Sequence, residues 1–437
     1  MAEPSSSSTE EMSQEPVRVV TEQAKATILE PPQKSVSPLF IVTLAVSLMA
    51  GGLSVICIKQ LLLPLQVSLI DPIHTNSSFT LVASLSAFIG MIASPLLGAV
   101  SDRTPWRWGR RRPWIVFGLV ALVIGLLLMA FASSIAGLLI GEIVVQIGND
   151  TLFATLNALI PDLVPPQQRT LATAAGGIAP TFGGVVGLLL VNGLTNTRIP
   201  AQGYSLLAVV SVILVLCVLI AVREQPLPAG VLPPFRLRTF LFGLVRPLGR
   251  RDFALVFASR FLAFLGFTIL GAYLLFSIRS GNPHLPVSVA AGRVTTFQVI
   301  SATALLIASL IIGITKRNQR LKPLVIGGAL LMMVGLLLLV SMPIWPQMLL
   351  AACFFGAGFG VYLAADLNLA VRVLPRQEES GKDLGILNMT IFLTLIISPI
   401  VGGMVIAVTH SYALLFGLAA LACLGAAVLI LLVRSVR

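Results

Sequence analysis

Long apolar runs, each bounded by proline, glycine or charged residues, follow one another along the chain from Pro38 onward. A membrane-spanning helix needs about 20 mostly apolar residues, and each run reaches that length. The pattern predicts helices over 38–63, 79–100, 113–132, 136–160, 171–191, 203–222, 253–278, 292–314, 323–343, 347–373, 384–408 and 411–433. We therefore expect an all-α membrane protein with twelve transmembrane helices.

Composition indicates that the bilayer is the solvent of this chain. Apolar residues occupy 57% of the 437 positions and charged residues only 11%, whereas soluble domains are about 25% charged. The spans and their short loops leave no room for the large extramembrane domain that a receptor or scaffold would need. Residues 1–36 are rich in Ser, Glu and Pro and are predicted to form a disordered cytoplasmic tail.

The distribution of lysine and arginine predicts the orientation. If the N-terminus is cytoplasmic, the great majority of the 29 Lys and Arg residues fall in cytoplasmic segments, as the positive-inside rule requires. We expect a multi-pass protein of the cell membrane with both termini in the cytoplasm. The charge of +12 is spread over short loops, so nucleic acid is not an expected partner.

Sequence motifs of enzymes and metal sites are missing. There is no His-Glu-x-x-His, Gly-x-Ser-x-Gly or Walker-type loop. The three histidines are all predicted on the extracellular side, and the four cysteines lie in apolar spans without ligand spacing. We expect neither an enzyme nor a metal or cofactor site, and the missing Walker loop disfavours ATP-driven transport.

Two loops repeat at one offset along the chain. Pro113 and Pro323 differ by 210 positions, and so do Pro165 and Pro375. This repeat predicts two parallel six-helix halves with a central cavity between them. The predicted parts are a tail at 1–36, a first bundle at 37–222, a cytoplasmic linker at 223–252 and a second bundle at 253–437.

Three motifs and the order of helices resemble the major facilitator superfamily. The motifs are Gly98-Ala-Val-Ser-Asp102-Arg103 with Gly109-Arg-Arg-Arg-Pro113, Asn149-Asp150 with Ala158-Leu-Ile-Pro-Asp-Leu163, and Leu374-Pro375 with Gly381-Lys-Asp-Leu-Gly385 and Asn388. They are similar to those of the sucrose-type proton–sugar symporters and, less closely, of the glycoside–pentoside–hexuronide group. The resemblance implies the major facilitator fold and transport by alternating access.

The first motif forms a loop between the second and third helices. In the superfamily this loop works as a cytoplasmic gate, which implies gating roles for Asp102, Arg103, Arg110 and Arg111. Asp162 lies at the inner end of the fourth helix and is the expected partner of Arg103 or Arg110, because arginine binds a nearby carboxylate bidentately. The alternative is that the arginines only set the topology.

A polar stripe runs along the fourth helix. Its members are three or four positions apart and so share one helix face; they are Glu142, Gln146, Asn149, Asp150, Phe153 and Asn157. Ionisable groups in a bilayer usually face a cavity or a partner, so this face is interpreted as the surface for solute or protons. A set of structural hydrogen bonds is the alternative.

The stripe departs from the sucrose-type pattern. That family's intramembrane aspartate corresponds to Gln146, its nearby arginine to Asn157, and the second Asn of its pair to Asp150. Glutamine carries no proton, so the family's coupling site cannot be transferred unchanged. Asp150 lies one turn away and is the candidate that replaces it; an uncoupled facilitator is the other interpretation.

Two ion pairs are predicted within the membrane. Arg260 and Asp366 lie at similar depth on helices that are neighbours in this superfamily, and an unpaired arginine there would be costly; the alternative is that both side chains extend to the cytoplasmic surface. Lys59 and Glu142 form a weaker analogue in the first half. Tyr362, one turn before Asp366, is a candidate solute contact because sugars stack on aromatic rings; core packing is the other interpretation.

These features together predict a secondary active transporter. The expected solute is small and polar, a sugar or glycoside in first place, with proton coupling and the lipid bilayer as environment. Sodium is less expected, because only Asp150 and Glu142 offer carboxylates for it. An uncoupled facilitator, or an exporter of another small or drug-like solute, is the alternative.

Overall fold

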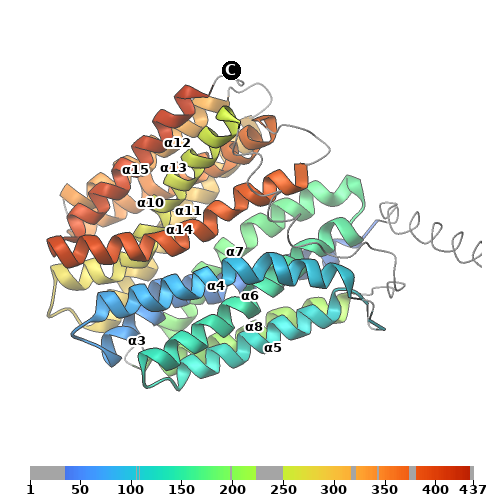
Figure 1. Cartoon of the computed structure of the whole chain (residues 1–437), viewed down its shortest axis with the longest axis horizontal. Helices are drawn as coiled ribbons and strands as arrows, with labels where there is room; N and C mark the ends of the chain where they lie inside the picture. Colours follow the sequence, from blue (N-terminus) through green and yellow to red (C-terminus); the bar gives the residue numbers. More distant parts are fainter. Residues whose placement is uncertain are drawn as a thin grey trace, which may run out of the picture.

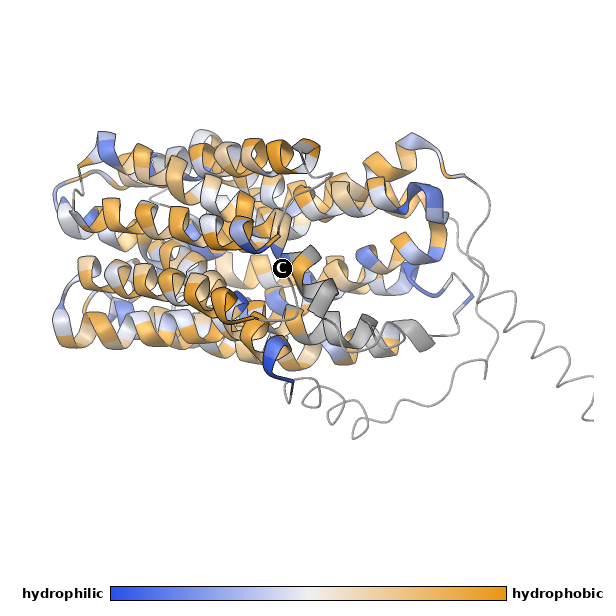
Figure 2. Cartoon of the chain, turned by 90° about the horizontal axis from the view of Figure 1, so that it is seen from above, coloured by the Kyte–Doolittle hydropathy of each residue, from blue (hydrophilic) through white to orange (hydrophobic). Residues whose placement is uncertain are grey.

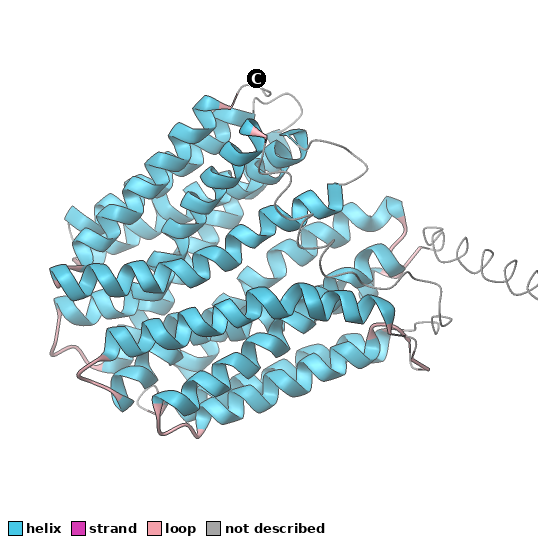
Figure 3. Cartoon of the chain, in the orientation of Figure 1, coloured by secondary structure: helices cyan, strands magenta, loops and turns pink. Residues whose placement is uncertain are grey.

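The computed structural model describes residues 35–104, 106–107, 109–196, 199–222, 250–315, 321–341, 344–373 and 380–433. The regular structure of these segments is helical (Figure 3). The helices are α2 Pro38–Cys57, η1 Ile58–Leu62, α3 Leu63–Ile70, α4 Thr75–Arg103, α5 Arg112–Ala130, α6 Ile135–Leu163, α7 Pro166–Leu194, α8 Pro200–Ala221, α10 Arg251–Gly281, α11 Val287–Thr315, α12 Leu321–Ser341, α13 Trp345–Val373, α14 Ser380–Thr409 and α15 Tyr412–Leu432. Together they make 12 candidate membrane spans, with α2, η1 and α3 as one continuous span.

The predicted helices are present, but most of them are longer than predicted. The first continues through the π-helical turn η1 to Ile70, and α4 begins at Thr75 rather than 79. Hydropathy underestimates such ends, because polar residues and Pro166, which occupies the first position of α7, still fit a helix start. Helix α10 begins at Arg251, inside the predicted linker. Residues 1–34 of the tail and 223–249 of the linker lie outside the described residues.

The helices pack in two groups. The first group, α2 to α8, and the second group, α10 to α15, each make most of their contacts internally. Between the groups, α4 packs on α14, α7 on α11, and η1 on α10. Because the number of spans is even, α2 begins and α15 ends on the same side, which we call the termini side; the opposite side is the far side (Figure 1).

The two groups are joined in the far half of the bundle. Thr80 Oγ donates to the carbonyl oxygen of Pro399 at 2.9 Å, and Ser84 Oγ donates to that of Ile396 at 3.0 Å. Toward the termini side the second group spreads away from the first (Figure 1). Apolar side chains cover the outer faces of the helices and polar residues gather at their ends (Figure 2), as expected of a lipid-facing surface.

Glycines set the closest helix contacts in the first group. A Cβ atom at Gly183 of α7 would overlap the carbonyl oxygen of Met49 in α2, and one at Gly52 would overlap that of Pro180. Since backbone atoms cannot rotate away, the two helices approach this closely only where a side chain is missing.

Replacing Gly183 with alanine should therefore destabilise the protein. Overpacking of a tight contact costs about 1–3 kcal/mol, which thermal unfolding of the detergent-purified protein measures. Gly177→Ala in the same helix is the matched control, because its Cβ would meet nothing within 4 Å and alanine is the better helix former. An equal loss in both variants would show that the α2–α7 contact is not the cause.

Candidate transport site

The polar stripe of α6 is buried at its centre. Ser134 caps the helix by accepting a hydrogen bond from the Gly137 backbone at 3.1 Å. From there the helix buries four polar side chains in succession: Glu142, Gln146, Asn149 and Asp150 are between 1% and 7% exposed. A buried polar group is costly unless it has partners, so these contacts define the site.

Gln146 and Asp150 form the middle of the stripe. The Gln146 amide nitrogen donates to both carboxylate oxygens of Asp150, at 3.0 Å each. Gly90 of α4 makes room for them: a Cβ there would lie 2.6 Å from Gln146 Cγ and 2.8 Å from an Asp150 oxygen. The carboxylate is thus held by a neutral amide against a helix backbone, an arrangement in which it can take up a proton without breaking an ion pair.

Asn149 and Phe153 show where the stripe points. Asn149 lies against Gly51 of α2, whereas Gln146 and Asp150 lie against α4, so the stripe faces the space between α2 and α4. Phe153, nearer the termini side, is 47% exposed. Asn157 is half-buried, and its amide donates to the Phe153 carbonyl at 2.8 Å, within the same helix. The stripe therefore becomes accessible toward the termini side.

The turn η1 connects this site to the second group. Lys59 Nζ lies 3.5 Å from a carboxylate oxygen of Glu142, as predicted for this pair. The next residue, Gln60, accepts a hydrogen bond from Gln298 of α11. Single π-helical turns often occur at functional sites, and this one aims adjacent side chains at different helix groups. The second oxygen of Glu142 and the side-chain oxygen of Asn149 find no hydrogen-bond partner among the described residues.

The second group contains a buried ion pair of its own. The structure brings Arg260 of α10 into contact with Asp366 of α13, and the two residues are 6% and 1% exposed. The guanidinium also lies over the Phe264 ring, 5.1 Å from its centroid. Neither side chain extends to the surface, in agreement with the predicted contact rather than with its alternative.

Tyr362 does not lie on an accessible surface. Its side chain is 0% exposed, and its backbone packs against α12, where a Cβ at Gly328 would lie 2.7 Å from the Tyr362 nitrogen. The interpretation of Tyr362 as a solute contact is therefore corrected to core packing beside Asp366, because close packing of α12 and α13 leaves no space for a solute.

The loop between α4 and α5 is held by one carboxylate. Asp162 at the end of α6 contacts Arg110 at 2.5 Å and Arg111 at 3.0 Å, and Arg111 also donates to Ser101 at 3.2 Å. Arg110 is the predicted partner of Asp162, and Arg111 is an additional one. These contacts join helix ends of the first group only. The side chains of Asp102 and Arg103 lie outside the described parts of the structure.

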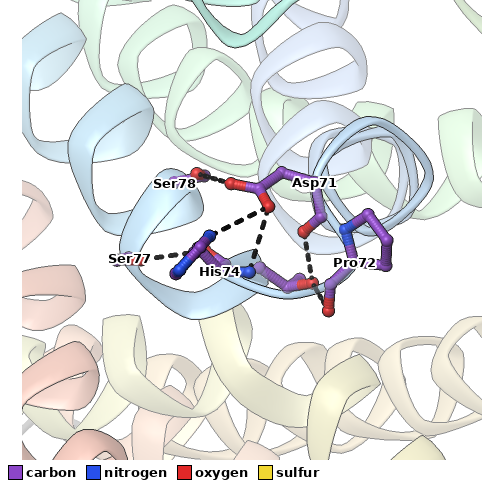
Figure 4. Close-up of polar contacts among 6 residues, drawn as sticks. Asp71, Pro72, His74, Ser77 and Ser78 are labelled. Carbon is purple, nitrogen blue, oxygen red and sulfur yellow. Dashed lines mark hydrogen bonds and ion pairs between the residues drawn. The ribbon is translucent and has the colours of Figure 1, made fainter.

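A capped turn on the far side was not predicted. Asp71, between α3 and α4, accepts hydrogen bonds from the Ser78 hydroxyl at 2.7 Å and from the His74 backbone at 3.0 Å (Figure 4). His74 Nδ1 lies 3.4 Å from the same carboxylate. The hydrogen bond from Ser78, followed by that from His74, lowers the pKa of Asp71. An aspartate shortly before a polar helix start is the signal that indicates such a cap.

Asp71→Asn should lower thermal stability at neutral pH by a small amount. The carboxylate has a lower pKa in the folded state, so its contribution is present above its unfolded pKa and is lost as pH falls through the folded pKa. The difference in Tm between wild type and variant should shrink in acid. A difference that is independent of pH would contradict the role of the ionised carboxylate.

Comparison with known proteins decides the family. A family model described as MFS/sugar transport protein matches residues 72–372. The chain belongs to this family. The matched segment runs from the Asp71 turn to the end of α13 and so includes the stripe of α6 and both intramembrane ion pairs except Lys59. As a member of the MFS/sugar transport family, the protein is a multi-pass membrane transporter.

Individual relatives of this transporter match over shorter segments. Solute carrier family 45 member 4 of Mus musculus is 29% identical over 128 residues, which are 26% of this chain and 16% of the relative. Sucrose transport protein SUC3 of Arabidopsis thaliana is 27% identical over 152 residues, 28% of this chain and 25% of the relative. Solute carrier family 45 member 3 of Homo sapiens is 28% identical over 161 residues, 34% and 29% of the two chains.

Solved structures agree with the fold over almost the whole chain. A mutant of the nucleoside transporter NupG aligns with a TM-score of 0.68 at 14% identity, covering 90% of this chain and 98% of that one. A bacterial homologue of the human lysosomal transporter Spinster, solved in an inward-facing and unoccupied conformation, aligns with a TM-score of 0.63 at 13% identity, covering 91% and 95%. At these identities the likeness concerns the fold alone.

Proposed function

We propose that this member of the MFS/sugar transport family is a secondary active transporter that moves a sugar or glycoside together with protons by alternating access. The observation that carries the proposal is Asp150, a buried carboxylate held by the neutral amide of Gln146 on a polar stripe. Intramembrane carboxylates of this kind serve proton relays in transporters. The sucrose transport protein among the relatives supports a sugar as solute.

The orientation is part of the proposal. With both termini in the cytoplasm of a cell-membrane protein, the far side faces outward, and the structure corresponds to a state closed outside and spread apart inside. The likeness to the Spinster homologue in its inward-facing conformation supports this assignment. Residues 37–222 and 253–437 would then rock as two units around the stripe, with 223–252 as linker.

The residues have separate roles in this cycle. Glu142, Gln146, Asn149, Asp150 and Asn157 form the solute and proton surface, with buried oxygens of Glu142 and Asn149 ready to accept hydrogen bonds from sugar hydroxyls. Asp102, Arg103, Arg110, Arg111 and Asp162 form the cytoplasmic gate. The contacts of Asp162 with the two arginines hold its loop in place in the open state.

Uptake into proteoliposomes tests the proposal. Labelled sucrose, maltose and related glycosides are offered with and without an inward proton gradient. Uptake that rises with the gradient supports the symporter. Uptake that ignores the gradient supports the second candidate, a facilitator, which the glutamine at position 146 favours because it cannot carry a proton. Failure of every sugar would overturn the solute class but not the fold.

A further inference from the structure

A hollow of about 1030 Å³ opens on the far side of the bundle, away from the stripe of α6. Its walls come from α3 and α4 of the first group and from α10, α14 and α15 of the second. Among the polar residues that line it are Ser68, His74, Asn76, Arg279, His410 and Tyr412. Since both groups contribute, the hollow has this shape only while they are joined on the far side.

Arg279 is the permanent charge of the hollow. It lies half-buried in the last turn of α10, and its guanidinium donates to Ser68 Oγ at 3.1 Å, across the boundary between the groups. No ion pair of the described residues includes it, whereas Arg110 and Arg111 share Asp162 and Arg260 contacts Asp366. A guanidinium offers five donors in a fork that fits a carboxylate.

In the part of the chain that the structure describes, no acidic side chain lines the hollow to balance this charge. The acid closest in the loop, Asp71, directs both of its oxygens to the first turn of α4, where Ser78 and His74 hold them (Figure 4). The other titratable lining groups are two histidines and Tyr412. The wall thus presents hydrogen-bond donors around an arginine whose hydrogen-bond partner, Ser68, is neutral.

The remaining wall is apolar. Phe276 of α10 and both Ile400 and Met404 of α14 line it. Ligand pockets for small organic molecules are about 300–1,000 Å³ and are mostly apolar with a few placed polar groups, which is the character of this hollow.

We propose that the hollow is a binding site for a small organic anion, whose carboxylate contacts Arg279 and whose apolar body packs on Phe276, Ile400 and Met404. A ligand held by both groups binds the conformation joined on the far side and not the one in which they separate there. By population shift it stabilises the state described here and inhibits the transport cycle. The site is distinct from the stripe of α6, so it does not depend on the identity of the transported solute.

Thermal unfolding with benzoate as the probe tests the site without a transport assay. Benzoate should raise the Tm of the detergent-purified protein in a concentration-dependent way at neutral pH, and benzamide, its neutral analogue of the same shape, should not. Arg279→Gln should abolish the benzoate shift and Arg279→Lys should keep part of it. Arg293→Gln is the matched control, because this arginine of α11 stacks on Trp345, 5.2 Å from the ring centroid, and is not among the lining residues.

A second variant keeps the test decisive if Arg279→Gln does not fold. Met404→Trp should fill the hollow, leave Arg279 in place and still abolish the benzoate shift. Equal shifts with benzamide and benzoate, a full benzoate shift in Arg279→Gln or Met404→Trp, or no shift in the wild type would each overturn the proposal.

Discussion

Asp366→Leu should destabilise the transporter by about 3–5 kcal/mol, because it leaves the guanidinium of Arg260 buried without its carboxylate. The two residues are 6% and 1% exposed, so water cannot replace the lost partner as it does at a surface. Arg260→Leu should cost a comparable amount, since it leaves the carboxylate buried instead. Thermal unfolding in detergent and the yield of monodisperse protein measure both losses.

The double variant Arg260→Leu with Asp366→Leu separates pairing from packing. Replacing both members of a buried ion pair by apolar residues is often neutral or stabilising, so the double variant should be more stable than either single one. The exchanged pair, Arg260→Asp with Asp366→Arg, should likewise be better tolerated than each reversal alone. If the effects of the single changes simply add, the two charges do not stabilise each other and the contact has no energetic role.

Arg293→Leu is the control for loss of an arginine as such. This side chain also lies over an aromatic ring, Trp345, at 5.2 Å, but it is only half-buried. Its removal should cost about 0.5–1 kcal/mol, the contribution of a partly exposed cation–π contact. A loss as large as that of Arg260→Leu would indicate that the measured effect does not arise from the buried pair.

The number of helices and the pair in the second group follow from one-dimensional information. Apolar runs of membrane length predict each span, and the distances of Arg260 and Asp366 from their helix ends place both at one depth. The pair was therefore predictable once α10 and α13 were taken as neighbours. The same reasoning suggests Lys59 with Glu142, which the structure also brings together.

Features that depend on packing between distant segments could not be predicted in this way. Gln60 and Gln298 are 238 positions apart, and the turn η1 that aims Gln60 at α11 leaves the apolar pattern unchanged. Tyr362 shares a helix face with Asp366, but whether that face is accessible depends on Gly328 of α12, whose missing side chain lets the helices close over it. Periodicity predicts a face, and only the neighbouring helix decides what covers it.

Asp150→Asn should abolish the response of sugar uptake to a proton gradient while leaving exchange of the sugar across the membrane intact. The variant keeps the shape of the side chain and an oxygen that accepts the hydrogen bonds of Gln146, which both carboxylate oxygens receive at 3.0 Å in the wild type. Only the capacity to bind a proton is removed. Uptake with an imposed gradient, compared with counterflow exchange without one, separates coupling from solute binding.

Asp71→Asn is the matched control for this experiment. It also neutralises one aspartate, but in the far-side turn where the carboxylate caps α4 (Figure 4), so gradient-driven uptake should persist. Gradient-driven uptake that survives Asp150→Asn would move the coupling role to another carboxylate of the stripe, and Glu142→Gln would be the next variant to measure.

The double variant Gln146→Asp with Asp150→Asn asks whether the acid must occupy one position. It moves the carboxylate one helical turn along the same face, about 5.4 Å, and leaves an amide at position 150 to donate to it. If coupling requires only an acid between α2 and α4, gradient-driven uptake should return in the double variant. If it does not return, the contact of Asp150 with the α4 backbone at Gly90, where a Cβ would lie 2.8 Å from the carboxylate, is part of the coupling site, and the position of the acid matters as much as its charge.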